Sequence, residues 1–266
     1  MNIKSKEKVT IYLAYHKTAS KWMWNNFFST RYSCYQINIR ELSKNDILRE
    51  INYYNSDSPI ILRTRLEDGL MGTEIYDIVG RIKEIFTDPK IIISPRSQRS
   101  LVASHYGQYV MNGGRYTYKK YLNEVVKNKW HYSEFISLLF KAFGKNNVFV
   151  YLFEEFVHDK YNLLLNLEKF IGQSKTGLTR NELEKLINKP KMNPQRNDLV
   201  IDVALVLNKL RLRHRKNAIL PIIKGPSGDH LLVEFVAFIV NQLNKRFNIN
   251  IKYRNYNQLE LLDKAY

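Results

Sequence analysis

The chain has 266 residues, of which 44% are hydrophobic and 13% aromatic, enough for one sizeable core or for one domain with an added lobe. The 42 lysines and arginines outnumber 25 aspartates and glutamates, and the net charge of +17 favours anionic partners such as nucleotides, nucleic acids, acidic glycans or an anionic membrane surface. The single cysteine, Cys34, excludes an intramolecular disulfide and a metal site built from several cysteines.

The two ends of the chain bear on localisation. Residues 1–8 lead directly into a predicted strand, without the apolar region of a signal peptide. The longest apolar run near the other end, residues 231–240, is about half as long as a membrane span and contains Glu234. We therefore expect a cytoplasmic protein without a membrane span.

Predicted strands and helices alternate along most of the chain. Apolar and β-branched runs predict strands at residues 9–15, 34–37, 59–63, 90–94 and 147–153. Apolar residues at helical spacing predict helices after residue 20, from Ser43, over residues 75–86, around residues 101–109, from an N-cap at Ser133 to Gly144, and up to Gly172.

This alternation predicts an α/β fold with three αβα layers, in which helices cover both faces of a central parallel sheet of about five strands. From residue 179 onward the pattern is helical, so we expect a helical C-terminal part. No linker divides the chain, which predicts a single domain over residues 1–266. The tyrosine- and lysine-rich residues 113–132 are expected to form a lid or an inserted lobe within it.

The turn after the first predicted strand has the features of an anion site. Backbone N–H groups at the start of a helix lack partners within the helix and lie at the positive end of its dipole. Lys17 adds a cation, and the hydroxyl groups of Thr18 and Ser20 add hydrogen-bond donors. A solvated surface lysine in an ordinary turn is the competing interpretation. The turn lacks the spacing of a Walker A loop, which argues against an ordinary nucleoside triphosphatase.

Further polar residues follow other predicted strands. Arg63, Arg96 and the pair Glu154-Glu155 each come at or just after the end of a strand. In parallel sheets, ligands bind outside the carboxyl ends of the strands. We therefore expect these residues and the turn at Lys17 to meet at one edge of the sheet.

Several motifs in this order resemble those of sulfotransferases. Residues 17–22, KTASKW, resemble the family's loop for a 5′-phosphosulfate, which reads lysine, small, small, hydroxyl, any residue, tryptophan. Ser104 follows eight residues after Arg96, with Tyr106 beyond it, and this spacing is similar to the family's 3′-phosphate motif. VFVYLFEEF at residues 148–156, MNP at 192–194 and KGPSGDH at 224–230 resemble later family segments.

The resemblance implies a fold like that of P-loop NTPases and transfer of a sulfuryl group from 3′-phosphoadenosine 5′-phosphosulfate (PAPS), without a metal, leaving the product PAP. It implies that Lys17 offsets charge on the leaving phosphate, while residues 18–21 supply backbone donors. The cofactor-binding residues that it implies are Lys17, Thr18, Ala19, Ser20, Lys21, Trp22, Arg96, Ser104, Lys224 and Gly225.

Trp22 would stack on the adenine ring, with a place in the protein core as the competing interpretation. Trp24 is the better core candidate, since it shares a helical face with Phe27 and Phe28. Arg96 and Ser104 would hold the 3′-phosphate.

Three positions depart from the family pattern. Ala19 replaces a glycine, which requires that Ala19 keep a negative φ. Phe153 replaces a tyrosine, and Ile223 replaces an arginine.

The general base is expected after the third strand. The family's histidine is absent there, because the segment reads Arg63-Thr64-Arg65, and Arg63 would stand for a catalytic lysine. Just beyond, LEDGLMG at residues 66–72 looks like an acidic stretch of bacterial sulfotransferases. We expect Asp68, or else Glu67, to take the acceptor proton, against the interpretation that both are solvated carboxylates.

The acceptor is expected to be a small molecule or a glycan, O- or N-sulfated, and the sequence leaves the oligomeric state open. Tyr116, Tyr118, Trp130 and Tyr132 could line an acceptor cleft or pack a lid. The alternatives are a basic protein that binds nucleotides or nucleic acid, a small-molecule kinase, and an inactive family member that binds cofactor alone. No recognised nucleic-acid motif is present, so a nucleic-acid partner is not expected.

Overall fold

The structure is a computed structural model that divides into two compact units. The first contains residues 1–97 and 128–192, and the second contains residues 98–127 and 193–266. Within them the structure describes residues 9–41, 43–53, 59–66, 73–126, 132–172, 178–190 and 198–210, with 235, 236, 238, 239 and 242. A single domain over residues 1–266 stays a prediction.

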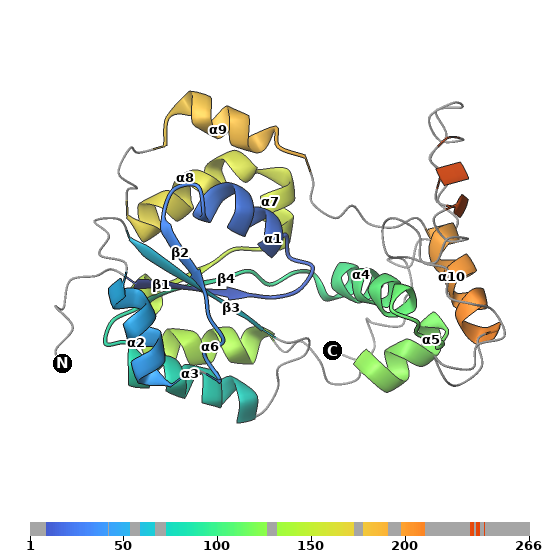
Figure 1. Ribbon diagram of the computed structural model, residues 1–266, viewed down its shortest axis with the longest axis horizontal. Helices are drawn as coiled ribbons and strands as arrows, with labels where there is room; N and C mark the ends of the chain where they lie inside the picture. The colour runs from blue at the N-terminus through green and yellow to red at the C-terminus, as the bar shows by residue number, and fades with distance from the viewer. Residues whose placement is uncertain are drawn as a thin grey trace. The chain divides into compact units, whose positions relative to one another are not determined.

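The described part of the first unit contains one parallel five-stranded sheet with the order β2-β3-β1-β4-β5 (Figure 1). The predicted α/β fold is therefore confirmed. The strands are β1 (Val9–Ala14), β2 (Ser33–Gln36), β3 (Ile60–Arg65), β4 (Lys90–Ile93) and β5 (Val148–Val150).

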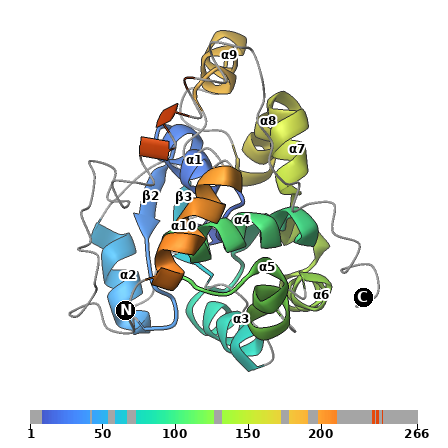
Figure 2. The same ribbon diagram turned by 90° about the vertical axis from the view of Figure 1, so that its right-hand side faces the viewer.

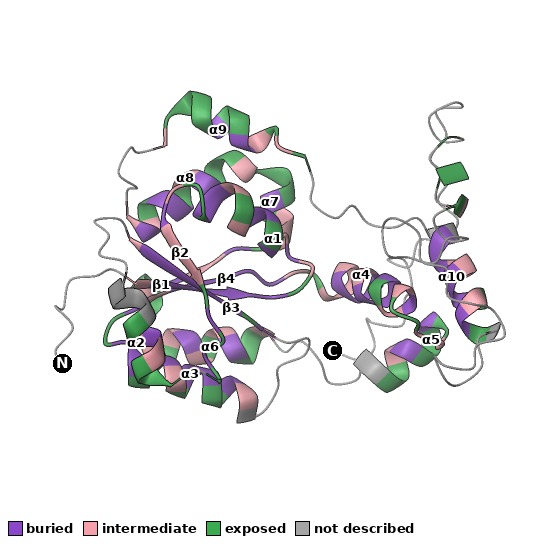
Figure 3. Ribbon diagram, viewed as in Figure 1, coloured by how far each residue is buried: buried purple, intermediate pink, exposed green. Residues whose placement is uncertain are grey.

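Both faces of the sheet are buried, since successive side chains of a strand alternate between them. Ile11 and Leu13 of β1 join one apolar cluster, and Tyr12 and Ala14 join the other. Figure 3 shows the burial of the strands and of the helix surfaces that face them. This double burial explains why the strands read as continuous apolar runs in the sequence.

Helices cover each face of the sheet, as predicted (Figure 1). One layer consists of α2 (Lys44–Tyr53), α3 (Thr73–Ile85) and α6 (Tyr132–Phe143). The opposite layer consists of α1 (Ser20–Trp22), the π-helical η1 (Met23–Phe28), α7 (Phe153–His158) and α8 (Lys160–Ile171), with α9 (Arg180–Ile187) outside α8. A short 3₁₀ turn, η3 (Lys145–Asn147), precedes β5.

Three predicted boundaries are wrong in detail. The last strand ends at Val150, and Phe153 already begins α7. Asp159 separates α7 from α8, and its side chain accepts a hydrogen bond from the backbone of Asn162, so one predicted helix is two. Ser133 lies inside the first turn of α6 and is not its N-cap. The glycine stops are confirmed, since Gly144 and Gly172 follow α6 and α8 with positive φ.

The described residues of the second unit contain helices, as predicted for residues 101–109 and for the C-terminal part, while the lid or lobe expected at residues 113–132 stays a prediction. It contains α4 (Gln98–Met111), α5 (Tyr118–Tyr121), the π-helical η2 (Leu122–Val126) and α10 (Asp198–Leu210). Figure 2 shows α10 across α4, where Asn208 Nδ2 donates hydrogen bonds to the carbonyl oxygens of Val110 (2.7 Å) and Gly114 (3.0 Å). Within the described residues, no helix is long and apolar enough to span a bilayer.

Candidate functional site

The carboxyl ends of β3, β1, β4 and β5 are neighbours in the sheet. The turn at Lys17 follows β1, Arg63 lies near the end of β3, Arg96 follows β4, and Glu154 follows β5. These polar residues therefore meet at one edge of the sheet, as the sequence predicted. Among the described residues, this edge is the candidate site.

The turn after β1 has an uncommon backbone. Lys17 (φ 60°) and Ala19 (φ 57°, ψ 16°) both have left-handed conformations. The expectation that Ala19 keeps a negative φ is wrong. Its carbonyl oxygen accepts a hydrogen bond from the backbone N–H of Met23 (3.0 Å), which begins the helix and holds the turn. Left-handed residues next to right-handed ones form the backbone nests that bind anions, and each such non-glycine residue costs about 1–2 kcal/mol.

The Thr18 hydroxyl is turned into the protein. It donates to the Tyr15 carbonyl oxygen (3.0 Å), accepts from the Ser94 hydroxyl (3.0 Å), and Thr18 is fully buried. The expectation that this hydroxyl is a donor for a ligand is wrong, because its own hydrogen is used beneath the turn. Nearby, the buried hydroxyls of Tyr12 and Tyr151 are 3.2 Å apart, and burial raises the pKa of both. These buried hydrogen bonds hold the inner side of the turn in place.

Arg63 is a buried cation beside this turn. The residue is 6% exposed, and its Nη2 lies 3.4 Å from the Ser20 hydroxyl oxygen. Its guanidinium carbon lies 5.5 Å from the centre of the Trp24 ring, while Nε is buried without a hydrogen-bond partner. Burial lowers the pKa of Arg63, and no carboxylate among the described residues pairs with it. An arginine stays protonated even so, so a positive charge remains in the protein interior next to the turn.

Arg96 links the turn to the end of β5. Its Nη1 donates to the Lys17 carbonyl oxygen (2.7 Å), and its guanidinium carbon lies 4.2 Å from the centre of the Phe153 ring. Burial lowers the pKa of Arg96, while the nearby Glu154 carboxylate raises it. Sequence reasoning missed the contact with Phe153. The available signal was Phe153 itself, an aromatic residue that stands where the family has a tyrosine.

Trp22 belongs to the core of the first unit. It is 3% exposed and contacts Phe156 edge-on, with ring centres 5.1 Å apart. The Lys160 ammonium lies 4.6 Å from the Trp22 ring centre, and the indole N–H is buried without a partner among the described residues. Trp24 is only partly buried, so the expectation that it is the better core residue is wrong. Stacking of adenine on Trp22 stays a prediction.

The remaining predicted site residues are not tested by the described part of the structure. Lys21 is exposed in α1, and Ser104 is partly buried in α4 of the second unit, so a 3′-phosphate site shared by Arg96 and Ser104 stays a prediction. Glu67, Asp68, Lys224 and Gly225 lie outside the described residues, as do Trp130 and residues 192–194. No group of three or more possible histidine, cysteine or carboxylate metal ligands occurs in the described ranges.

The predicted acceptor aromatics have different settings. Tyr118 is 7% exposed and packs against Tyr106 in the second unit, with ring centres 5.0 Å apart. Tyr116 is partly buried, and the Lys120 ammonium lies 4.6 Å from its ring centre. Tyr132 belongs to α6 in the first unit and packs edge-on against Tyr15. A lining role for these residues stays a prediction.

No protein-family model matches the chain, and no curated protein matches its sequence. Among solved structures, the chain is similar to a sulfotransferase from Alicyclobacillus acidocaldarius, with a TM-score of 0.50 and 14% identity over 74% of this chain and 94% of that chain. A parallel αβα fold is thus shared with a bacterial sulfotransferase. The protein has the sulfotransferase fold.

Two further solved structures resemble the chain more distantly. A mouse sulfotransferase complexed with PAP has a TM-score of 0.48 and 16% identity, over 68% of this chain and 63% of that chain. Retinol dehydratase in complex with androsterone and the inactive cofactor PAP has a TM-score of 0.40 and 13% identity, over 67% of this chain and 63% of that chain.

Proposed function

We propose that the protein is a sulfotransferase that moves a sulfuryl group from PAPS to a hydroxyl or amine of a carbohydrate or small-molecule acceptor. The observation that carries this proposal is Arg63. Its guanidinium is buried beside the nest-like turn at Lys17, and no carboxylate among the described residues balances its charge. A buried charge without a partner is costly. An anionic ligand at the turn would supply the missing counter-charge.

The residues at the turn fit a phosphosulfate group. Lys17 and Arg63 supply positive charge, and the left-handed backbone at Lys17 and Ala19 suits N–H donation to an anion. PAPS would supply the activated sulfuryl group. By the resemblance, Arg96 and Ser104, with Lys224 and Gly225, would hold its 3′-phosphate.

The chain's own residues have two chemical tasks in the transfer. Lys17 and Arg63 offset the negative charge that grows on the leaving phosphate, and this effect is stronger in a site of low dielectric constant than in water. Asp68 or Glu67 takes the proton of the acceptor as its oxygen or nitrogen bonds to sulfur and the bond from sulfur to the phosphate oxygen breaks. The transfer would be an in-line displacement, with PAPS supplying the activated sulfuryl group.

The test combines nucleotide binding with sulfuryl transfer. We expect calorimetry to detect PAP binding to the wild type and at least about tenfold weaker binding to Arg63→Met, because a charge-assisted contact is lost. Arg180→Met is the matched control, since Arg180 lies on α9 with 82% of its side chain exposed. Transfer from labelled PAPS to a panel of sugars, phenols and amines then identifies the acceptor.

Other outcomes would overturn the proposal. Equal binding of PAP and 5′-AMP that weakens steeply with salt would favour a nucleic-acid-binding protein. Phosphoryl transfer from ATP that requires Mg²⁺ would favour a small-molecule kinase. Binding of PAP without transfer to any acceptor would identify an inactive relative.

A further inference from the structure

Arg96 is held on two sides within the first unit. Its Nη1 donates to the carbonyl oxygen of Lys17 at 2.7 Å, and its guanidinium carbon lies 4.2 Å from the Phe153 ring centre. Sequence reasoning assigned Arg96 only to a 3′-phosphate. The structure gives this arginine a contact with the turn that would receive the 5′-phosphosulfate.

The Lys17 carbonyl belongs to a residue with an unfavourable backbone. Lys17 has φ 60°, and Ala19, two residues on, has φ 57°. A residue with a β-carbon keeps this conformation only where surrounding contacts hold it. A hydrogen bond from a charged guanidinium is stronger than one between neutral groups, so the bond from Arg96 is suited to hold the turn.

Phe153 is itself fixed relative to Arg96. Its backbone N–H donates to the carbonyl oxygen of Pro95, the residue before Arg96, at 2.9 Å. On the other side, the backbone N–H of Ser97 donates to Glu154 Oε1 at 3.1 Å. The segment after β4 is thus joined to the start of α7 on both sides of the arginine. The ring and the guanidinium that lies over it are therefore held in register.

We propose that Phe153 and Arg96 are positioning residues for the turn at Lys17. The Phe153 ring supports the Arg96 guanidinium, and the guanidinium holds the Lys17 carbonyl, so that the turn keeps its left-handed form before any donor binds. The consequence for nucleotide affinity rests on the proposed sulfotransferase function, whereas the consequence for the turn itself does not.

The first test measures the turn without ligand. Hydrogen–deuterium exchange of a peptide covering residues 15–22 is compared in the wild type, Arg96→Ala, Phe153→Leu and Phe153→Tyr, with Arg180→Ala as a control for loss of an arginine. We expect exchange about tenfold faster in Arg96→Ala and about threefold faster in Phe153→Leu. Phe153→Tyr keeps the aromatic face and should match the wild type. Unchanged exchange in Arg96→Ala, or equal effects of leucine and tyrosine at 153, overturns the proposal.

The second test separates positioning from direct contact with a 3′-phosphate. Calorimetry compares PAP with 5′-AMP, which lacks that phosphate. If Arg96 positions the turn, Arg96→Ala and Phe153→Leu weaken both nucleotides by similar factors, about tenfold and about threefold. Loss of PAP affinity alone in Arg96→Ala, with no effect of Phe153→Leu, would assign Arg96 to the phosphate and overturn the proposal. If the wild type binds neither nucleotide, the proposed function fails. The exchange measurement alone then decides whether Arg96 and Phe153 position the turn.

Discussion

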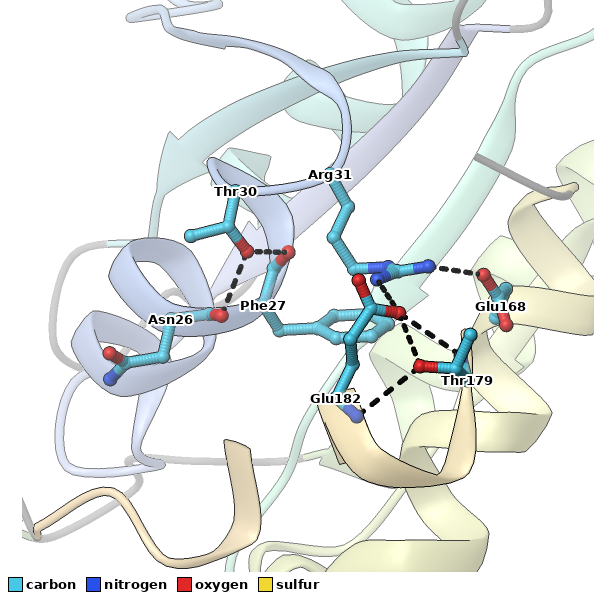
Figure 4. Close-up of polar contacts among 7 residues, drawn as sticks. All are labelled: Asn26, Phe27, Thr30, Arg31, Glu168, Thr179 and Glu182. Carbon is cyan, nitrogen blue, oxygen red and sulfur yellow. Dashed lines mark hydrogen bonds and ion pairs between the residues drawn. The ribbon is translucent and has the colours of Figure 1, made fainter. Parts of the chain in front are cut away.

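Two buried arginines of the first unit differ in what balances their charge. The Arg31 side chain is 6% exposed, and its Nη2 lies 2.8 Å from Oε1 of Glu168, whose side chain is 10% exposed (Figure 4). Its Nη1 lies 3.7 Å from Oε2 of Glu182. Arg63 is also buried, with 6% of the whole residue exposed, yet no carboxylate among the described residues pairs with it.

The partners of Arg31 explain its place in the fold. Glu168 belongs to α8, while Glu182 lies in the first turn of α9, where it exchanges hydrogen bonds with Thr179 as part of the helix cap. Arg31 therefore joins the turn after η1 to two helices of the covering layer (Figure 4).

Arg63 has no carboxylate among its described neighbours. Its neighbours are the Ser20 hydroxyl and the Trp24 ring, which solvate a cation only weakly. Desolvation makes a buried charge costly, and a carboxylate offsets that cost for Arg31 but not for Arg63. The charge of Arg31 is therefore balanced by carboxylates of the fold, whereas the charge of Arg63 is left unbalanced among the described residues, which is the observation behind the proposed anion site.

The largest expected effect on stability comes from breaking the ion pair between Arg31 and Glu168. We expect Glu168→Gln to lower the free energy of unfolding by about 3 kcal/mol, because the buried Arg31 charge then loses its near partner. Urea denaturation followed by circular dichroism measures the change. Glu184→Gln removes an exposed carboxylate from its pair with Arg180 and should cost less than about 0.5 kcal/mol. Equal effects of the two changes would show that the Arg31 pair contributes no more than a surface pair.

Removal of the charge at Arg63 is expected to change the free energy of unfolding in the opposite direction. Arg63→Met removes a charge without leaving a buried carboxylate behind, so we expect the free energy of unfolding to stay constant or to rise by about 1 kcal/mol. The same denaturation experiment measures it, with Arg31→Met as the matched change at the compensated site, where a clear loss of stability is expected. A loss at Arg63 as large as the loss at Arg31 would make both arginines structural.

The two regions also differ in backbone strain. The non-glycine residues with positive φ in the described ranges are Lys17 and Ala19, both in the turn beside Arg63. We expect Ala19→Gly to raise the free energy of unfolding by about 0.5 kcal/mol, because relief of the left-handed strain exceeds the entropy that glycine gains in the unfolded chain. Ala142→Gly in α6 is the control and should lower stability by about 0.5 kcal/mol. A loss of stability in Ala19→Gly would mean that the turn is not strained.

The order of strands and helices could be predicted because the central strands β1, β3 and β4 contain apolar runs that are buried on both faces. The meeting of Lys17, Arg63 and Arg96 at one edge followed from the rule for parallel sheets. Both features follow from the pattern of apolar residues and from the order of strands and helices along the chain, and a single sequence contains this information.

The orientation of individual side chains at the site could not be predicted, because it depends on hydrogen bonds and on contacts between distant residues that a sequence pattern does not reveal. The π-helical stretch η1 has a hydrogen bond from Ser29 to Trp24, five residues back, so Trp22 and Met23 face the core with Phe27 and Phe28 in place of Trp24. The inward Thr18 hydroxyl requires Ser94, which is 76 residues away in the chain.

The smallest effect concerns Cys34, on β2 close to the Arg31 pair. Burial raises the pKa of its thiol from 9.0 to about 12. The folded state therefore favours the protonated thiol. This contribution to stability is fully present below pH 9 and is lost as the pH rises toward 12. At pH 8 the thiolate is scarce, so we expect iodoacetamide to modify the folded protein at least about tenfold more slowly than the urea-unfolded chain. Mass spectrometry of time points measures both rates, and Cys34→Ala confirms the site of reaction. Equal rates would show that the thiol is as accessible and as acidic in the fold as in the unfolded chain.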